Sequence, residues 1–400
     1  MRPSLRLFAG GWLALLLALQ PAHAQRARPW GAGITGQVVL DANAANDWIP
    51  FARTAGGLVA VRATVNDKPM LALVDTGAPY TVMDAGFAQL NGIKLLRTVA
   101  PGKNRVSVYV GAIDRMRVGP VTQTGGRLAA IDLSRMGNVM GMPITMILGA
   151  DYLRTLAVEF DFDRARLRLR ASGSKGPEGI IVPLTMMAPA NRFIISMRIG
   201  EVPVNRVLID TGINATLSVT TPVWKRLPLA GVRVTTTQAY NLYGKVIWPL
   251  ARFEGAAIGP APIPGKVEII NDEDGILDTP ADALIGMEAL RYFNVFLDAR
   301  ARIMILSPRS VPHGAQPLST IGILGHGAEK GFAVEHVMKG SPAAFAGIAD
   351  GDMVCTVDGA SIARGTPGSR ENWAGQPVGT RLSIGLCSGR TVPLTLAEFY

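Results

Sequence analysis

The sequence predicts a mostly β protein in which two tandem copies of one β domain are followed by a different C-terminal domain. Three observations predict this fold class. Glycine and proline are abundant, with 45 and 27 residues and no fixed period, which favours a chain rich in turns. Short β-branched or alternating runs, such as residues 58–65 and 193–199, are separated by turn residues. The tripeptide Asp-Thr-Gly occurs twice, at residues 75–77 and 210–212.

Composition excludes several classes of protein. The 400 residues, 48% hydrophobic and 18% charged, suit about three folded domains and exclude a disordered chain. With only 2 Cys and 4 His, the chain has too few ligands for a zinc ribbon or an iron–sulfur protein, and we expect no metal and no cofactor. The net charge of +10 comes without a basic block, so we expect no nucleic-acid partner.

Residues 1–24 have the layout of a secretory signal peptide. Basic residues precede an apolar run over residues 7–19, and small residues form a cleavage site at residues 22–24. The run is shorter than the roughly 20 residues that span a bilayer, which favours cleavage over an uncleaved membrane anchor. We therefore expect a mature protein that begins at Gln25, is exported to the periplasm and is not stably inserted in the membrane.

The two Asp-Thr-Gly tripeptides lie at equivalent positions of a long repeat. Their aspartates are 135 residues apart, and each follows an apolar run. Downstream, Ile-Leu-Gly at residues 147–149 recurs as Leu-Ile-Gly at residues 284–286, and upstream Ile49-Pro50 recurs as Val182-Pro183. A register kept over most of a domain indicates a duplication.

The repeat and the linkers set the domain boundaries. We expect the first lobe at residues 48–170 and the second at residues 180–308. Residues 171–179 are polar and glycine-rich, as an inter-lobe linker should be, and a proline-rich spacer over residues 307–317 precedes the third domain, residues 318–400.

The repeated aspartates carry the candidate chemistry. A carboxylate at the end of a buried strand costs several kcal/mol of desolvation unless it is protonated or hydrogen-bonded, so its repetition implies a use. If the pseudo-two-fold symmetry brings Asp75 and Asp210 together, they share one proton, because two like charges about 3 Å apart cannot both ionise. The ionised aspartate would deprotonate a water that attacks a carbonyl carbon, and the protonated one would donate to the oxyanion.

The neighbouring small residues fit such a pair. The hydroxyls of Thr76 and Thr211 are short enough to bond the partner loop across the symmetry axis. Gly77 and Gly212 lack the Cβ that would keep the two loops apart.

These residues resemble the retropepsin-like aspartic peptidases. Their pattern is an apolar strand, Asp-Thr-Gly-Ala/Ser, and a later apolar-apolar-Gly strand that crosses behind the active loop. The first copy matches throughout, Ala78 included, whereas Ile213 in the second copy stands where Ala or Ser is expected.

The resemblance implies two acid-protease-like β lobes that form a pseudo-two-fold dimer in one chain, as in pepsin. It implies Asp75 and Asp210 as the catalytic pair, with Gly149 and Gly286 backing the active loops. A β-hairpin flap is implied in each lobe, and we nominate residues 109–111 and 243–244 for the two flaps.

The third domain resembles a PDZ domain. Ser341-Pro342 is typical of a helix start, Gly347 of its end, and Asp358-Gly359 of a turn after a strand. The resemblance implies that a loop holds a peptide's terminal carboxylate while the peptide adds to the sheet edge. A purely structural or degenerate PDZ domain is the alternative. The loop residues are Thr320, Ile321, Gly322 and Ile323.

We assign no catalytic role to the cysteines, to the histidines or to the other acidic residues. Cys355 and Cys387 fall on strands that neighbour each other in PDZ folds, so they could form a disulfide after export, or remain two free thiols. His336 is expected to be a surface or strand residue, and Asp151 to be solvated or to cap a helix.

The expected function is that of an exported aspartic endopeptidase that hydrolyses peptide bonds with the Asp75/Asp210 pair. The PDZ domain would bind polypeptide segments or C-termini, so the expected partners are polypeptide substrates and a peptide ligand. One alternative is a non-catalytic peptide-binding protein with a degenerate cleft, which Ile213 favours. Another is self-processing at the linker over residues 171–179.

Overall fold

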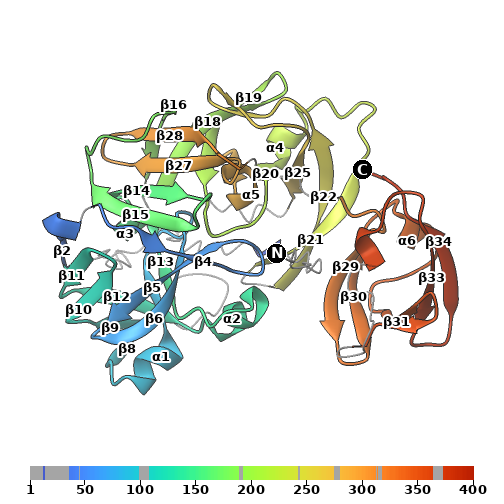
Figure 1. Ribbon diagram of the computed structural model, residues 1–400, viewed down its shortest axis with the longest axis horizontal. Helices are drawn as coiled ribbons and strands as arrows, with labels where there is room; N and C mark the ends of the chain where they lie inside the picture. Colours follow the sequence, from blue (N-terminus) through green and yellow to red (C-terminus); the bar gives the residue numbers. More distant parts are fainter. Residues whose placement is uncertain are drawn as a thin grey trace.

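The mostly β fold class is confirmed by four β-sheets with short helices between them (Figure 1). No helix in the part of the chain that is described is long and apolar enough to cross a membrane. The computed structural model describes residues 12–13, 36–44, 46–98, 108–188, 192–241, 244–273, 280–311, 313, 318–363 and 373–400.

The first sheet comes from the N-terminal half and has the strand order β2-β11-β10-β5-β6-β13-β7-β12-β9-β8, with β4 paired to β5. Short helices follow three of its strands, namely α1 (Ala85–Leu90), α2 (Ser134–Met140) and α3 (Ala150–Leu153). The strands are β2 (Gln37–Leu40), β4 (Ala52–Arg53), β5 (Val59–Val65), β6 (Lys68–Val74), β7 (Val82–Asp84), β8 (Leu95–Thr98), β9 (Val108–Ala112), β10 (Arg115–Val118), β11 (Val121–Thr124), β12 (Arg127–Ile131) and β13 (Met146–Leu148).

The second sheet repeats this order. Its strands run β21-β22-β25-β20-β26-β19-β18-β23-β24, which is the order of the first sheet read from its other end. Strands β21 and β22 thus correspond to β8 and β9, and β19 corresponds to β6. β17 pairs with β18, and β1 (Trp12–Leu13) pairs with the outer edge of β21. The strands and helices are β17 (Thr185–Met187), β18 (Arg192–Ile199), β19 (Val202–Ile209), β20 (Leu217–Thr220), α4 (Thr221–Trp224), β21 (Thr235–Asn241), β22 (Gly244–Phe253), β23 (Ala257–Ile258), β24 (Ala261–Pro262), β25 (Val267–Asp272), β26 (Ala283–Ile285) and α5 (Met287–Leu290).

A third, six-stranded sheet joins the two halves. Its order is β16-β28-β27-β14-β15-β3, and the join is the antiparallel pair β14 and β27, in which Val158 lies opposite Leu297. The apolar core runs without a break from the first sheet through this sheet into the second. The strands are β3 (Ile49–Pro50), β14 (Leu156–Asp161), β15 (Arg166–Ala171), β16 (Ile180–Pro183), β27 (Phe293–Asp298) and β28 (Ile303–Pro308).

The C-terminal residues form a separate sheet with its own apolar core, and we call residues 318–400 the C-terminal domain. The order is β29-β30-β31-β33-β34, which leaves β29 at one edge, with β32 paired to β31. Helix α6 starts as predicted, because the Ser341 hydroxyl accepts from the backbone N–H of Ala344. The elements are β29 (Ile323–Ala328), β30 (Gly331–Val337), α6 (Pro342–Phe345), β31 (Met353–Val357), β32 (Ala360–Ser361), β33 (Arg381–Leu386) and β34 (Thr391–Thr395), with short 3-10 turns at Ala42–Ala44 and Trp373–Gly375.

Candidate active site

Strands β6 and β19 each run directly into an aspartate. The backbone N–H of Asp75 donates to Leu148 O at 3.0 Å, and that of Asp210 donates to Ile285 O at 2.9 Å, so each aspartate is tied to the apolar strand of its own repeat. Both side chains are fully buried. The two repeats therefore deliver two carboxylates to the interior in the same way.

The two threonines connect the loops by a reciprocal set of hydrogen bonds. The Thr76 hydroxyl donates to Ile209 O at 2.7 Å and accepts from the Thr211 N–H at 3.1 Å. The Thr211 hydroxyl donates to Val74 O at 2.7 Å and accepts from the Thr76 N–H at 3.0 Å. Each hydroxyl thus bonds the opposite repeat twice, which fixes the two loops against each other.

Glycine is required where the loops meet. A Cβ on Gly77 would collide with the Asp210 carboxylate, and a Cβ on Gly212 would collide with the Asp75 carboxylate. Each aspartate therefore lies against the glycine of the other repeat, and the two carboxylates face each other across the symmetry axis.

The glycines that end β13 and β26 lie behind these loops. A Cβ on Gly149 would collide with the backbone of Tyr80, and one on Gly286 would collide with the carbonyl of Ala215. These two glycines thus occupy the backing positions that the sequence pattern implies.

Backbone donors hold one oxygen of each carboxylate. Asp75 Oδ1 accepts from the N–H groups of Gly77 and Ala78, both at 2.9 Å, and Asp210 Oδ1 accepts from Gly212 N–H at 2.8 Å. The Oδ2 atoms are buried and accept no hydrogen bond from a donor group of the described residues. Two buried carboxylates in contact are stable only with a proton between them.

Asp75 and Asp210 hold the shared proton with unequal strength. Burial raises the pKa of Asp75 to about 6, while backbone hydrogen bonds and the charge of Arg192 act in the opposite direction. Burial raises the pKa of Asp210 well above its ordinary value, and the Asp75 charge raises it further. Asp75 is therefore the first to ionise, and Asp210 keeps the shared proton.

Sequence reasoning missed two buried residues, one that acts on the pair and one that holds the chain after the first active loop. Arg192 opens β18, is buried, and its positive charge lowers the pKa of both aspartates. Asp151 is buried rather than solvated, and its Oδ1 accepts from the N–H and the hydroxyl of Thr81, each at 2.8 Å. The only signal for either is a charged residue at the end of an apolar segment.

The N-terminal part of this site matches a known family. A family model described as aspartyl protease matches residues 61–152, which include Asp75, Gly77 and Gly149. Residues 61–152 are thus similar to an aspartyl protease domain. The crystal structure of basic 7S globulin from soybean aligns with a TM-score of 0.38 and 11% identity, covering 68% of this chain and 94% of that chain. No curated protein matches the sequence.

The nominated flap residues fall differently from expectation. Residues 109–111 lie inside strand β9 of the first sheet, where a Cβ on Gly111 would crowd Met83, so they are not the tip of a hairpin. In the second repeat, β21 and β22 form a long hairpin, and Gly244 is the first residue of β22. Tyr243 lies outside the described residues.

The predicted carboxylate-binding loop of the C-terminal domain is largely buried. Thr320, Ile321 and Ile323 are each less than a tenth exposed, and Gly322 has a φ of +77°. The Gly322 N–H already donates to Ser319 Oγ at 2.9 Å. One of the donors expected to hold a peptide carboxylate is therefore in use within the domain.

A disulfide joins Cys355 and Cys387, which selects one of the two alternatives that the sequence left open. The pair links β31 to the residue that follows β33. It closes a loop whose ends are 32 residues apart, within the C-terminal domain.

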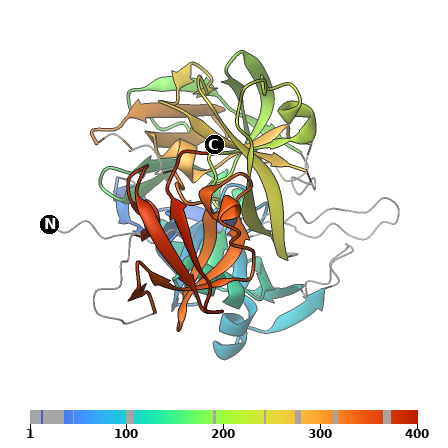
Figure 2. The same ribbon diagram turned by 90° about the vertical axis from the view of Figure 1, so that its right-hand side faces the viewer.

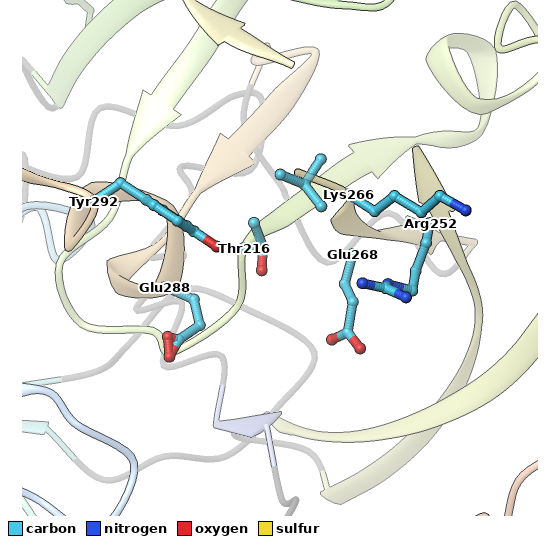
Figure 3. Close-up of a pocket in the computed structure, with 7 residues that line it drawn as sticks. Thr216, Arg252, Lys266, Glu268, Glu288 and Tyr292 are labelled. Carbon is cyan, nitrogen blue, oxygen red and sulfur yellow. The ribbon is translucent and has the colours of Figure 1, made fainter. Parts of the chain in front are cut away.

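A small cavity in the second repeat is not a substrate site. Its volume is about 20 Å³, enough for a single water. Figure 3 shows Glu268 beside Arg252, with Tyr292 and Glu288 on the opposite side. Its importance lies instead in the contact that Glu268 makes with the end of the chain.

Proposed function

We propose that the protein is an exported aspartic endopeptidase with two lobes, residues 48–170 and 180–308, and one cleft between them. The observation that carries this proposal is the reciprocal bonding of Thr76 and Thr211, which holds two proton-sharing aspartates together within one chain. A duplicated fold kept for binding alone has no need of two buried carboxylates in contact.

The unequal pKa values assign the roles. Asp75 is the base that takes a proton from a water molecule while the water oxygen attacks the peptide carbonyl carbon. Asp210 donates its proton to the carbonyl oxygen, which gives a neutral tetrahedral intermediate. The proton taken up by Asp75 then passes to the amine as the C–N bond breaks, and Asp210 recovers its proton from the hydroxyl of the intermediate as the acid product forms.

The alternative of a non-catalytic binder rests on Ile213. This residue is buried, and its carbonyl accepts from Met287 N–H at 2.9 Å, just as the Ala78 carbonyl accepts from Ala150 N–H at 2.8 Å. The larger side chain thus keeps this backbone bond, whereas the bond that Ala78 N–H donates to Asp75 Oδ1 has no counterpart from Ile213 among the described residues. The bond to the start of α5, which both repeats share in kind, favours catalysis over the binding alternative.

We further propose that the C-terminal domain is a PDZ domain that binds polypeptide segments at the free edge of β29. Use of the Gly322 N–H by Ser319 favours internal segments over free C-termini, because a terminal carboxylate needs that donor. Residues 1–24 are the proposed export signal, and sequencing the N-terminus of protein recovered from the periplasm tests it by the presence of Gln25 at the start.

Cleavage profiling of a peptide library by mass spectrometry between about pH 3 and pH 8 tests the catalytic proposal. Residues 25–400 should cleave, and Asp75→Asn and Asp210→Asn should each abolish cleavage while the chain stays folded. If only Asp75→Asn matters and the activity depends on protein concentration, first lobes pair between molecules instead. If the folded wild type cleaves nothing, the binding alternative replaces the proposal.

A further inference from the structure

The C-terminal domain lies against the β21–β22 hairpin of the second repeat. Figures 1 and 2 show the C-terminal sheet packed beside this hairpin and away from the first sheet. The hairpin spans residues 235–253 and is joined to the rest of its sheet through the pairing of β22 with β25.

Strand β21 holds the C-terminal domain at the start of the hairpin. The Thr235 hydroxyl donates to Lys339 O at 2.8 Å, and the Thr236 hydroxyl accepts from Lys339 N–H at 3.1 Å. The same Thr236 hydroxyl bonds His336 Nε2 at 2.8 Å. Thr235 and His336 are both buried, so His336 is a strand residue of β30 at the interface, which is the second of the two places that the sequence suggested.

A second set of bonds lies farther along the hairpin. Gln238 Nε2 donates to the Glu335 carboxylate at 2.6 Å, and Lys245 Nζ donates to the Glu335 carbonyl at 2.7 Å. Gln238 is fully buried. Both strands of the hairpin are therefore bonded to β30.

The last residues of the chain form the third contact. The Tyr400 hydroxyl donates to Glu268 Oε1 at 2.9 Å, and Arg233 donates to the Glu398 carbonyl at 2.6 Å. Arg252 forms an ion pair with the Glu398 carboxylate at 3.7 Å. The tail thus bonds β22, β25 and the segment that leads into β21.

An apolar cluster continues from the face that carries Asp210 into the C-terminal domain. Leu208 precedes Asp210 by two residues on an extended strand, so their side chains share a face, and Leu208 lies opposite Leu284. The neighbours of Leu208 on β19 point into the main core instead. The cluster comprises Ile194, Leu208, Ile213, Ala215, Ala239, Trp248, Leu250, Ile270, Ala281, Leu284, Leu324, Met338 and Tyr400.

We infer that the C-terminal domain is a fixed clamp that positions the β21–β22 hairpin over the Asp210 face, and is not a lid that leaves during turnover. Polar groups such as Gln238 and His336 are buried and paired at this interface. Separation would leave them without partners and would expose Leu324, Met338 and Tyr400. The clamp holds the hairpin even when no peptide is bound to the C-terminal domain.

A clamp and a domain that only recruits substrate predict different effects of substrate length on cleavage. A domain that only recruits polypeptides raises the cleavage of long substrates and leaves short peptides unaffected. A clamp that positions the hairpin affects peptides of every length, because Trp248 of the hairpin packs in the same apolar cluster as Leu208, on the face that carries Asp210.

A cross-link tests whether the domain must move. Arg233 and Glu398 are exposed, and the described residues contain no free cysteine, so Arg233→Cys with Glu398→Cys can be bridged by a short bismaleimide. We expect the bridged protein to keep its activity within about twofold of the single-cysteine variants treated alike. Loss of activity on bridging, in protein whose unbridged form is active, would show a lid that opens and would overturn the clamp.

Hydrogen exchange tests the positioning without relying on activity. Tyr400→Ala should raise amide exchange across residues 235–253 about tenfold, whereas Tyr400→Phe, which loses only the hydroxyl bond, should stay near wild type. In the same variants, kcat/KM for a short peptide should fall about tenfold with Ala and little with Phe. This activity readout rests on the proposed function; an inactive wild type would count against that function, and unchanged exchange in Tyr400→Ala would count against the clamp.

Discussion

The hydroxyls of Thr76 and Thr211 each form two hydrogen bonds, one as donor and one as acceptor. A short side chain with a hydroxyl on Cβ can form both, which explains why threonine occupies these positions. Each hydroxyl donates to a carbonyl and accepts from an N–H of the opposite repeat. All four partners are buried between the repeats, so no water can replace a lost hydroxyl. The bonds act on the geometry of Asp75 and Asp210 without touching the reacting atoms.

Replacement of the threonine hydroxyl should therefore damage both stability and activity. We expect Thr211→Val to lower the free energy of unfolding by about 2 to 4 kcal/mol, because it leaves Val74 O and Thr76 N–H unpaired. Thr211→Ser keeps the hydroxyl and should remain close to wild type. Denaturant unfolding and kcat/KM measure the two effects; equal losses in Val and Ser would point to the methyl group instead.

The raised pKa values predict a near-neutral activity profile. Cleavage needs Asp75 ionised and Asp210 protonated, so kcat/KM should rise as the pH rises through about 6 and fall once Asp210 loses its proton. An optimum near pH 3 would contradict this profile, because the pKa of Asp75 would then have to lie below its ordinary value and not be raised by burial.

The same shifts predict how stability depends on pH. A buried aspartate with a raised pKa binds its proton more tightly in the folded state, so its stabilising effect is complete below the ordinary pKa of 3.8 and is lost as the pH rises through about 6. Asp75→Asn removes this dependence and should be more stable than wild type above pH 6, by on the order of 1 to 3 kcal/mol. Chemical denaturation at a series of pH values measures it.

At the scale of elements, the site depends on two strand ends and on two glycines that let them meet. β6 and β19 occupy the same place in their sheets, and each is paired in parallel with the strand that ends in Gly149 or Gly286. The short helices α3 and α5 follow those glycines and start where the backing strand turns away. The chemistry is thus placed by strand register and not by long loops.

Close approach of the loops gives a sharp test. Gly77→Ala should abolish cleavage, because the added Cβ collides with the Asp210 carboxylate. Gly327→Ala, in an open position of β29 with nothing near the added Cβ, is the matched control and should leave the cleavage of a short peptide, which needs no binding at β29, unchanged. Circular dichroism shows whether each variant folds, and an active, folded Gly77→Ala would contradict the facing arrangement.

At the scale of the whole molecule, the first three sheets share a continuous core, while the C-terminal domain has a core of its own and a disulfide. Its contacts lie on the second repeat, so the two halves of the site are unequal although their sequences repeat. Residues 61–152, which match the aspartyl protease model, contribute Asp75, and Asp210 lies in the repeat that packs against the C-terminal domain.

The disulfide should matter for the C-terminal domain. Cys355 and Cys387 close a loop of 32 residues, for which loss of the bond costs about 4 kcal/mol. We expect a reductant to lower the melting temperature of the wild type, and Cys355→Ser with Cys387→Ser to melt at the reduced temperature with or without reductant. A melting temperature that reductant leaves unchanged would show that the bond contributes nothing to stability.

The sequence by itself determined the features that repeat or that a local backbone requires. The Asp-Thr-Gly register predicted which aspartates pair and why Gly77 and Gly212 must be glycine, and Ser341-Pro342 predicted the start of α6. Such signals are readable because each is carried by residues adjacent in the chain.

Only the tertiary structure decided the rest. Arg192 acts on the aspartates and Asp151 holds Thr81 because both are buried, and burial depends on segments far away in the chain. The clamp joins Thr236 to His336 and Glu268 to Tyr400, and these contacts have no counterpart among the described residues of the first repeat and no periodicity in the sequence. A single contact between two distant surfaces leaves no pattern in either segment, so it is fixed only when the surfaces pack together.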